Sequence, residues 1–219
     1  MKKIFIVGGS GKIARLLAQQ LSARGYLPQS LHRRAEQAEE LAALGATPVS
    51  GDLLALDATA LAGLMKGSDV VVFSAGAGGK GGPEMTNAID GQGLEVSVAA
   101  AIEAGIRRFI LVSAFPEAGR GRTVSDTFEN YMAVKKRADV HLAETDLDWV
   151  IVRPGTLVDK AGTGKVRAGL AIPYGEIPRG DVAATLLEII ERPQVNRIII
   201  ELTGGDTPVD QAIQQLVPA

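Results

Sequence analysis

Short apolar runs alternate with stretches of helical periodicity along this chain. Residues 4–7 (IFIV) form the first run, and apolar side chains then recur at Ile13, Leu16, Leu17 and Leu21, on one face of a helix. Six further runs, each fit for a strand, occupy residues 27–32, 47–50, 69–73, 109–112, 149–152 and 197–202. Helices are predicted over residues 36–44, 56–65, 89–104, 126–144 and 182–190, with one more starting at residues 207–210. This alternation predicts an α/β fold, with a doubly wound, mostly parallel sheet and helices on both of its faces.

Two segments interrupt the alternation. Residues 74–85 (SAGAGGKGGPEM) are too rich in glycine for a regular element and are predicted to be a loop, either a mobile lid over a substrate or an exposed connection. Residues 159–179 are the least regular part after the sixth strand. Because the chain has 219 residues and no linker, we expect one domain over residues 1–219, with a small C-terminal substrate region over about 155–219.

Composition narrows the range of functions. A net charge of −2, without a basic tract, gives no reason to expect a nucleic acid or a membrane as partner. The chain has no cysteine and only two histidines, so disulfides, cysteine nucleophiles and a metal site are not expected. These features favour a cytoplasmic protein that binds a small molecule.

A glycine motif joins the first predicted strand to the first predicted helix. The segment GGSGKIA (residues 8–14) fits the pattern G-x-G-x-x-G/A in this strand–turn–helix context. Glycine lets the backbone approach a pyrophosphate, and a helix start offers it free N–H groups and a partial positive charge. The motif therefore predicts a dinucleotide site whose phosphate contacts come from these residues: Gly8, Ser10, Gly11, Lys12 and Ile13.

The end of the second predicted strand indicates which dinucleotide is bound. A site that prefers NAD places Asp or Glu there, to accept a hydrogen bond from the ribose 2′-OH. This chain has Arg33 and Arg34 instead, and a guanidinium can pair with the 2′-phosphate of NADP. NADP is therefore expected over NAD, although two arginines could also simply solvate the start of a helix.

Several motifs together resemble a known family. They are GGSGKIA, GD at residues 51–52, DVVVFSAG at 69–76, RRFILVSA at 107–114, YMAVK at 131–135, WVIVRPG at 149–155 and RGDVA at 179–183. With these motifs the chain resembles the atypical short-chain dehydrogenases/reductases, the NAD(P)-binding branch that includes NmrA-like and epimerase/dehydratase-like proteins. The resemblance covers nearly the whole chain and implies a Rossmann-type fold in which long helices often form a homodimer.

The resemblance also implies roles for single residues. Asp52 and Leu53 would lie beside the adenine. Further cofactor contacts would come from Ser74, Ala75 and Gly76, and from Pro154, Gly155, Thr156 and Leu157 at the nicotinamide end. The chain departs from the larger family members at Ala114, where a second serine is common, and in the short segment 159–179. The short segment leaves little chain to hold a nucleotide sugar.

A catalytic set can be selected on the same basis. Tyr131 and Lys135 are four residues apart on a predicted helix, so they share one face, and Ser113 directly follows the fifth predicted strand. In the family the tyrosine donates a proton to a carbonyl oxygen, the lysine favours the phenolate, and the serine holds the substrate oxygen. Tyr-x-x-x-Lys also occurs by composition on helix surfaces, and Lys135 could hold the nicotinamide ribose without chemistry.

Three functions remain open at this stage. The first is an NADPH-dependent oxidoreductase acting on a small carbonyl or quinone-like substrate. The second is a regulatory protein of the NmrA type that senses NAD(P) without turnover. The third is an NAD(P)-dependent epimerase or isomerase that recycles its cofactor in place.

Overall fold

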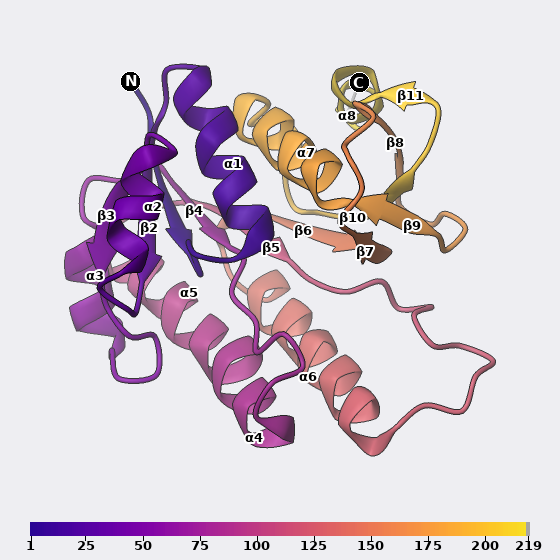
Figure 1. The fold of residues 1–219 in the computed structure, drawn as a ribbon, viewed down its shortest axis with the longest axis horizontal. Helices are drawn as coiled ribbons and strands as arrows, with labels where there is room; N and C mark the ends of the chain where they lie inside the picture. Colours follow the sequence, from indigo (N-terminus) through magenta and orange to yellow (C-terminus); the bar gives the residue numbers. More distant parts are fainter. Residues whose placement is uncertain (218–219) are drawn as a thin grey trace.

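A nine-stranded sheet forms the centre of the molecule (Figure 1). The computed structural model describes residues 1–217. The strands follow the order β11-β8-β10-β6-β5-β4-β1-β2-β3 across the sheet. Seven of them are mutually parallel: β1 (Lys3–Val7), β2 (Leu27–His32), β3 (Thr47–Ser50), β4 (Val70–Phe73), β5 (Arg108–Val112), β6 (Asp148–Pro154) and β10 (Ile198–Gly204). All seven predicted strands are therefore present, and the doubly wound, mostly parallel sheet is confirmed.

Two layers of helices cover the two faces of this sheet (Figure 1). Apolar side chains from β1 alternate between the faces, with Ile4 and Ile6 on one side and Phe5 and Val7 on the other, all fully buried. One layer consists of α1 (Lys12–Ala23), α2 (Gln37–Ala43), α7 (Arg179–Glu191) and α8 (Val209–Gln214), and the other of α3 (Ala58–Met65), α5 (Gly93–Glu103) and α6 (Asp126–Ala143). Because both faces are buried, the central strands are continuous apolar runs without a polar side.

The glycine-rich segment contains more structure than its composition predicts. A short helix, α4 (Gly82–Thr86), begins inside it and passes into a π-helical turn, η1 (Asn87–Gln92), before α5. The prediction of a loop through residue 85 and a helix from residue 89 is thus wrong at this boundary. Pro83 lies in the first turn of α4, where its fixed φ favours a helix start and its missing N–H costs nothing.

The segment 159–179 is also more ordered than predicted. It contains β8 (Lys165–Gly169), which runs antiparallel to β10, and β9 (Glu176–Pro178), which pairs with β7 (Thr156–Val158) in a separate two-stranded sheet. A two-residue strand, β11 (Thr207–Pro208), pairs with β8, so the last helix starts at Val209 rather than at Thr207. The residues after 155 therefore extend the same central sheet, and the molecule is one domain.

Candidate cofactor and substrate site

The turn between β1 and α1 lies where the strand order reverses, with β2 and β4 on either side of β1. Gly8 has φ of +79°, and a Cβ placed on it would be 2.5 Å from Cα of Ala75, directly after β4. A Cβ on Gly9 would be 2.6 Å from Cβ of Ser30 in β2. Glycine is therefore required at both positions, because the turn packs directly against the ends of its two neighbouring strands.

The start of α1 presents free donors at this turn. The amide of Gly11 donates to the carbonyl of Gly8 at 2.9 Å, and no side chain within residues 1–217 caps the helix. The first-turn amides of a helix have no intrahelical acceptor, so they are available to an anion. The hydroxyl of Ser10 is buried beside them and finds no hydrogen-bond partner in the described part of the chain. This donor set fits a pyrophosphate group.

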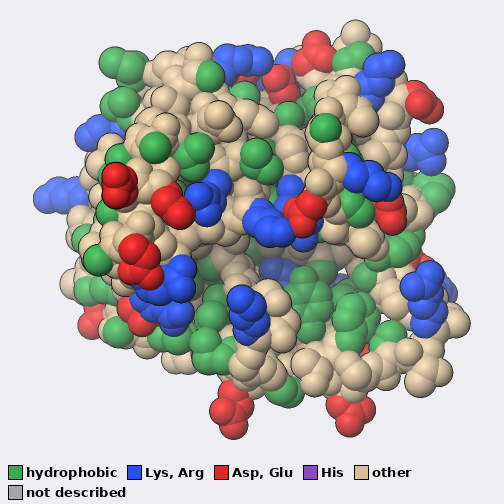
Figure 2. Space-filling view, in the orientation of Figure 1, with side chains coloured by type: hydrophobic (Ala, Val, Ile, Leu, Met, Phe, Trp, Pro, Cys, Tyr) green, Lys and Arg blue, Asp and Glu red, His purple; other side chains and the backbone are tan. Residues whose placement is uncertain are grey.

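Two cavities meet at this cradle. The smaller has a volume of about 250 Å³ and the larger about 860 Å³. Both are lined by the cradle and by the chain after β4: Ser10, Gly11, Ser74, Ala75 and Gly76. Figure 2 shows the hollow between the two helical layers, with Lys and Arg side chains along its rim. The shared residues make the two cavities one elongated groove, as a dinucleotide requires.

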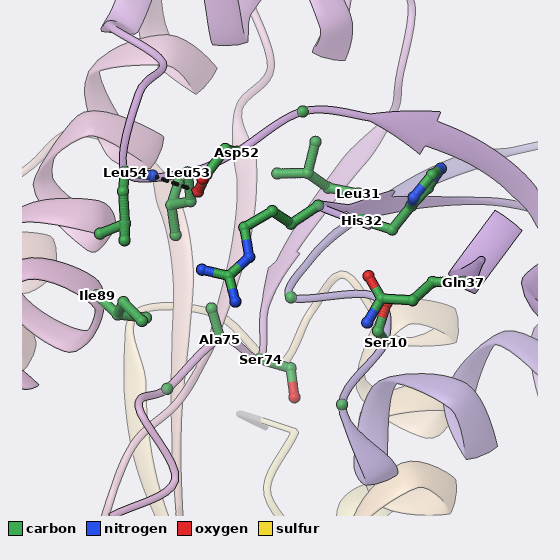
Figure 3. Close-up of a pocket in the computed structure, with 15 residues that line it drawn as sticks. Ser10, Leu31, His32, Gln37, Asp52, Leu53, Leu54, Ser74, Ala75 and Ile89 are labelled. Carbon is green, nitrogen blue, oxygen red and sulfur yellow. Dashed lines mark hydrogen bonds between the residues drawn. The ribbon is translucent and has the colours of Figure 1, made fainter. Parts of the chain in front are cut away.

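The smaller cavity combines apolar and polar walls. In Figure 3, Leu53, Leu54 and Ile89 lie on one side of it, and Ser10 and Ser74 on the other. Leu31 and Gln37 complete the lining near the end of β2, together with Arg33. The Asp52 carboxylate accepts a hydrogen bond from the amide of Leu54 at 3.1 Å, which shapes the turn after β3. Such walls suit an adenine with its ribose.

The structure separates the two adjacent arginines. Arg33 lines the smaller cavity, whereas Arg34 is outside its lining and its Nε lies 3.1 Å from a carboxylate oxygen of Glu36. Of the pair, Arg33 is thus the one positioned to meet a ligand.

The larger cavity contains the predicted catalytic side chains. Ser113, Tyr131 and Lys135 all line it, with Phe128 beside the tyrosine ring at a centroid distance of 6.2 Å. Ser113 is 5% exposed, and its hydroxyl has no hydrogen-bond partner within residues 1–217. A buried hydroxyl that lines a cavity without a partner can hydrogen-bond a substrate oxygen there.

Lys135 is held by a buried carboxylate that the sequence did not single out. Its Nζ donates to the carbonyl of Val112 at 3.0 Å and lies 3.6 Å from Oδ1 of Asp90, which belongs to η1. The other oxygen of Asp90 accepts from the amide of Ala77 at 2.9 Å. Asp90 therefore connects the lysine to the glycine-rich segment over the cavity. The only sequence signal for it is an acid within the predicted helix 89–104, most of whose residues are small or apolar.

Burial is the largest cause of the pKa shifts of Lys135 and Tyr131. It lowers the pKa of Lys135, while the carboxylates of Asp90 and Asp139 act to raise it. Burial, with the same two carboxylates, raises the pKa of Tyr131 to about 12. This direction is opposite to the lowering expected from the lysine, because the tyrosine is desolvated and the lysine charge is directed toward Asp90.

The remaining predicted cofactor residues divide between the lining and its surroundings. Lys12, Ile13 and Leu157 line the larger cavity, and Gly8 and Leu53 the smaller. Pro154, Gly155 and Thr156 are not part of either lining. Instead Thr156 Oγ1 lies 2.6 Å from the hydroxyl of Tyr174. The larger cavity is also lined by Lys80 and Arg179, which were not predicted as site residues from the sequence. No helix within residues 1–217 is long and apolar enough to cross a membrane.

Comparison with known proteins decides the family. Residues 8–193 match the family described as NAD(P)H-binding. The chain belongs to this family. The cradle, the two cavities and the strand order are thus those of an NAD(P)H-binding protein, and the resemblance to the atypical short-chain dehydrogenases/reductases is confirmed.

Relatives in the NAD(P)H-binding family align over nearly the whole chain. YhfK of Bacillus subtilis, an uncharacterised sugar epimerase by name, is 34% identical over 98% of this chain and 100% of its own. A Bacillus halodurans structure, named as an NAD-dependent epimerase/dehydratase, has a TM-score of 0.90 and 32% identity, covering 98% of this chain and 100% of that one. ChuY, an anaerobilin reductase from Escherichia coli O157:H7, has a TM-score of 0.78 and 25% identity over 94% and 98% of the two chains. Proteins named as reductases and proteins named as epimerases are therefore both similar to this chain.

Proposed function

We propose that this protein is an NADPH-dependent reductase of small carbonyl or quinone-like compounds. The observation that carries the proposal is the continuity of the groove. Arg33 lines one end, Ser113, Tyr131 and Lys135 line the other, and the glycine cradle lies between them. Its relation to ChuY, named as a reductase, supports the same reaction type.

The residues of the groove would hold the cofactor as follows. The first-turn amides of α1 and the hydroxyl of Ser10 would bind the pyrophosphate, and Leu53, Leu54 and Ile89 would pack on the adenine. The Arg33 guanidinium would pair with the 2′-phosphate. When bound, the reduced nicotinamide supplies a hydride equivalent to the substrate carbonyl carbon.

Tyr131 and Ser113 would act on the carbonyl oxygen. A pKa of about 12 keeps the Tyr131 phenol protonated at neutral pH, so its O–H can donate a proton as negative charge develops on that oxygen. The Ser113 hydroxyl, which has no partner in the described residues, would donate a hydrogen bond to the same oxygen. Lys135, held by Asp90 and the carbonyl of Val112, would help to position the cofactor and the substrate beside Tyr131.

Replacing the tyrosine tests the proton donor. A Tyr131→Phe variant, assayed by NADPH consumption with a panel of aldehydes, ketones and quinones, should lose roughly 10²–10³-fold in kcat because a general acid is removed. Its Kd for NADPH should stay within about twofold, since binding of the dinucleotide does not depend on that hydroxyl. Tyr26→Phe is the matched control, because the Tyr26 hydroxyl contacts Glu191 at the end of α7 and lines neither cavity. Unchanged turnover in Tyr131→Phe would refute this role.

The preference for NADPH is tested by binding alone. In Arg33→Gln the Kd for NADPH should rise roughly 10–100-fold, the equivalent of a lost charged hydrogen bond of about 1.5–3 kcal/mol. The Kd for NADH should change less than about twofold, because NADH lacks the phosphate. Equal losses for both dinucleotides would place Arg33 on another part of the cofactor.

An epimerase is the second candidate, favoured by the 34% identity to YhfK, which is named as a sugar epimerase. It predicts cofactor that copurifies with the protein and no net consumption of NADPH. A regulator of the NmrA type predicts comparable binding of oxidised and reduced cofactor with no turnover at all. Sustained NADPH oxidation with any compound of the panel contradicts both.

A further inference from the structure

Two cations from different helices meet on the rim of the larger cavity. Lys12 is the first residue of α1 and Arg179 the first of α7, and both line the cavity. Asp159, which follows β7, lies between them. Its Oδ2 is 2.6 Å from the Lys12 ammonium and its Oδ1 is 2.8 Å from the Arg179 guanidinium. One carboxylate is therefore shared by two positive charges.

The rim as a whole carries an excess of positive charge. Lys80 also lines the cavity, from the glycine-rich segment, and makes no ion pair within residues 1–217. Asp90 is the one acid among the described lining residues, and it is buried against Lys135 and the amide of Ala77. A cavity mouth with three cations and no free acid attracts an anion.

The cation pair can exchange its carboxylate for another. Side chains of Lys12 and Asp159 are 68% and 59% exposed, so their contact is in water, whereas Arg179 is 22% exposed and more firmly placed. Ion pairs exposed to this extent contribute little net free energy and are readily replaced. The position of Asp159 also shows that the two cations accommodate a carboxylate between them.

The same cavity also offers hydroxyl groups that suit a carbonyl. The unpartnered and buried hydroxyl of Ser113 and the phenol of Tyr131 both line it. A ligand that satisfies both sets of groups has a carbonyl for the hydroxyls and an anionic group for the cations of the rim.

We infer that the substrate is a carbonyl compound that also carries a carboxylate, bound by Lys12 and Arg179 in exchange for Asp159. This inference rests on the proposed reductase function and specifies its substrate class. The Arg179 guanidinium presents two parallel N–H donors to a carboxylate, which fixes the orientation of the substrate as well as adding affinity.

A matched pair of aldehydes tests the substrate class. 4-Formylbenzoate and its methyl ester share one skeleton and differ in the negative charge. In the wild-type protein kcat/KM should favour the acid, and the preference should decrease as NaCl is added. In Arg179→Gln the acid-to-ester ratio should fall about tenfold, the equivalent of about 1.4 kcal/mol. Lys160→Gln is the control, because Lys160 is an adjacent exposed cation that pairs with Glu176 outside the cavity.

Asp159→Asn tests the exchange itself. Removing the competing carboxylate should lower KM for 4-formylbenzoate and leave the KM of the ester within about twofold. Weaker binding of the acid in this variant would contradict the exchange. The NADPH Kd of Arg179→Gln is measured in parallel. If that Kd rises as much as the acid-to-ester ratio falls, the cations hold the cofactor pyrophosphate instead, and the inference is overturned.

Failure of the proposed reductase function can be distinguished from failure of the inferred carboxylate site. If neither aldehyde is reduced, titration calorimetry of the protein saturated with NADP⁺ compares binding of the two compounds directly. Tighter binding of 4-formylbenzoate that Arg179→Gln abolishes supports the anion site without the reaction. Equal binding of acid and ester overturns the inference.

Discussion

At the scale of single residues, Asp90 contributes most to the chemistry of the groove. It is 3% exposed, yet its two oxygens contact the Lys135 ammonium on α6 and the amide of Ala77 on the glycine-rich segment. Burial is the largest cause of both shifts, lowering the pKa of Lys135 and raising that of Tyr131, and the Asp90 carboxylate adds an upward contribution to both pKa values. Asp139, on the same helix as the tyrosine and the lysine, acts in the same direction as Asp90.

The pH dependence of the reverse reaction, the oxidation of an alcohol by NADP⁺, tests whether Asp90 influences the pKa of Tyr131. Oxidation of an alcohol needs the Tyr131 phenolate, so with a pKa of about 12 its rate should still be rising at pH 10. Asp90→Asn keeps an oxygen for the Ala77 amide but removes the charge, which should lower the pKa of Tyr131 and shift this rise to lower pH. Each unit of that shift increases the oxidation rate below the pKa about tenfold.

Glu95→Gln serves as the control, because Glu95 is an exposed acid on the neighbouring helix α5. A pH profile of kcat/KM that is the same in Asp90→Asn and in the wild type would show that Asp90 does not set the protonation of Tyr131.

Two glycines with the same backbone angle provide a second test at this scale. Gly8 and Gly25 both have φ of +79°, but a Cβ on Gly8 would meet Cα of Ala75 at 2.5 Å, whereas nothing lies within 4 Å of one on Gly25. Gly25→Ala should cost about 1–2 kcal/mol of unfolding free energy from backbone strain alone. Gly8→Ala should cost about 1–3 kcal/mol more, because of overpacking. Urea unfolding measures both, and equal losses would exclude the close approach to Ala75.

At the scale of elements, hydrogen bonds to Asp181 hold residues 163–164, in the segment after β7, against helix α7. Asp181 is 2% exposed, and its carboxylate accepts hydrogen bonds from the amides of Thr163 and Gly164 at 3.0 and 2.9 Å. The Thr163 hydroxyl adds a third donor at 3.2 Å. This acid in the first turn of α7 therefore holds residues 162–164, close in sequence to Asp159, against the helix that carries Arg179.

Asp181→Ala should lower the unfolding free energy by about 2–3 kcal/mol, because three hydrogen bonds to a buried carboxylate are lost. Asp210→Ala is the matched control, since Asp210 is an exposed acid in the first turn of α8. It should cost less than about 1 kcal/mol. Urea unfolding monitored by circular dichroism distinguishes the two, and similar losses would contradict the anchoring role.

The elements differ in how far the sequence predicts them. The seven parallel strands are predictable because both faces of the sheet are buried, so each strand is a continuous apolar run. β8 is not, because it lies near the sheet edge and of its five residues only Val166 is buried. Its pairing with β10 is a contact distant in sequence. Asp90 and Asp159 were not predicted for a related reason: their partners lie in other elements, so no local motif indicates these contacts.

At the scale of the whole molecule, one groove spans both halves of the chain. Its smaller cavity is built from residues 8–89, and its larger cavity adds Val112, Ser113, the start of α6, Leu157 and Arg179. A dinucleotide bound along the groove would therefore contact elements on both sides of the sheet centre, and its binding should stabilise the fold as a unit.

Thermal unfolding with and without nucleotide measures this coupling. A ligand at about 100 times its Kd adds about 2.7 kcal/mol, which for a domain of this size corresponds to roughly 5–10 °C in Tm. NADPH should give a larger shift than NADH at equal concentration, and Arg33→Gln should remove the difference. Arg34→Gln should leave the difference intact, because Arg34 pairs with Glu36 outside the cavity. No shift with either nucleotide would contradict the cofactor site.

The position of β1 between β2 and β4 has a consequence for biosynthesis. Because β1 to β4 are neighbours on one side of the sheet, that side can assemble once residues 1–73 have left the ribosome. Its helix α1, however, packs against α7, which ends at residue 191. An apolar flank of the nascent protein therefore stays uncovered until α7 has been synthesised, and during that interval we expect it to need shielding by a chaperone.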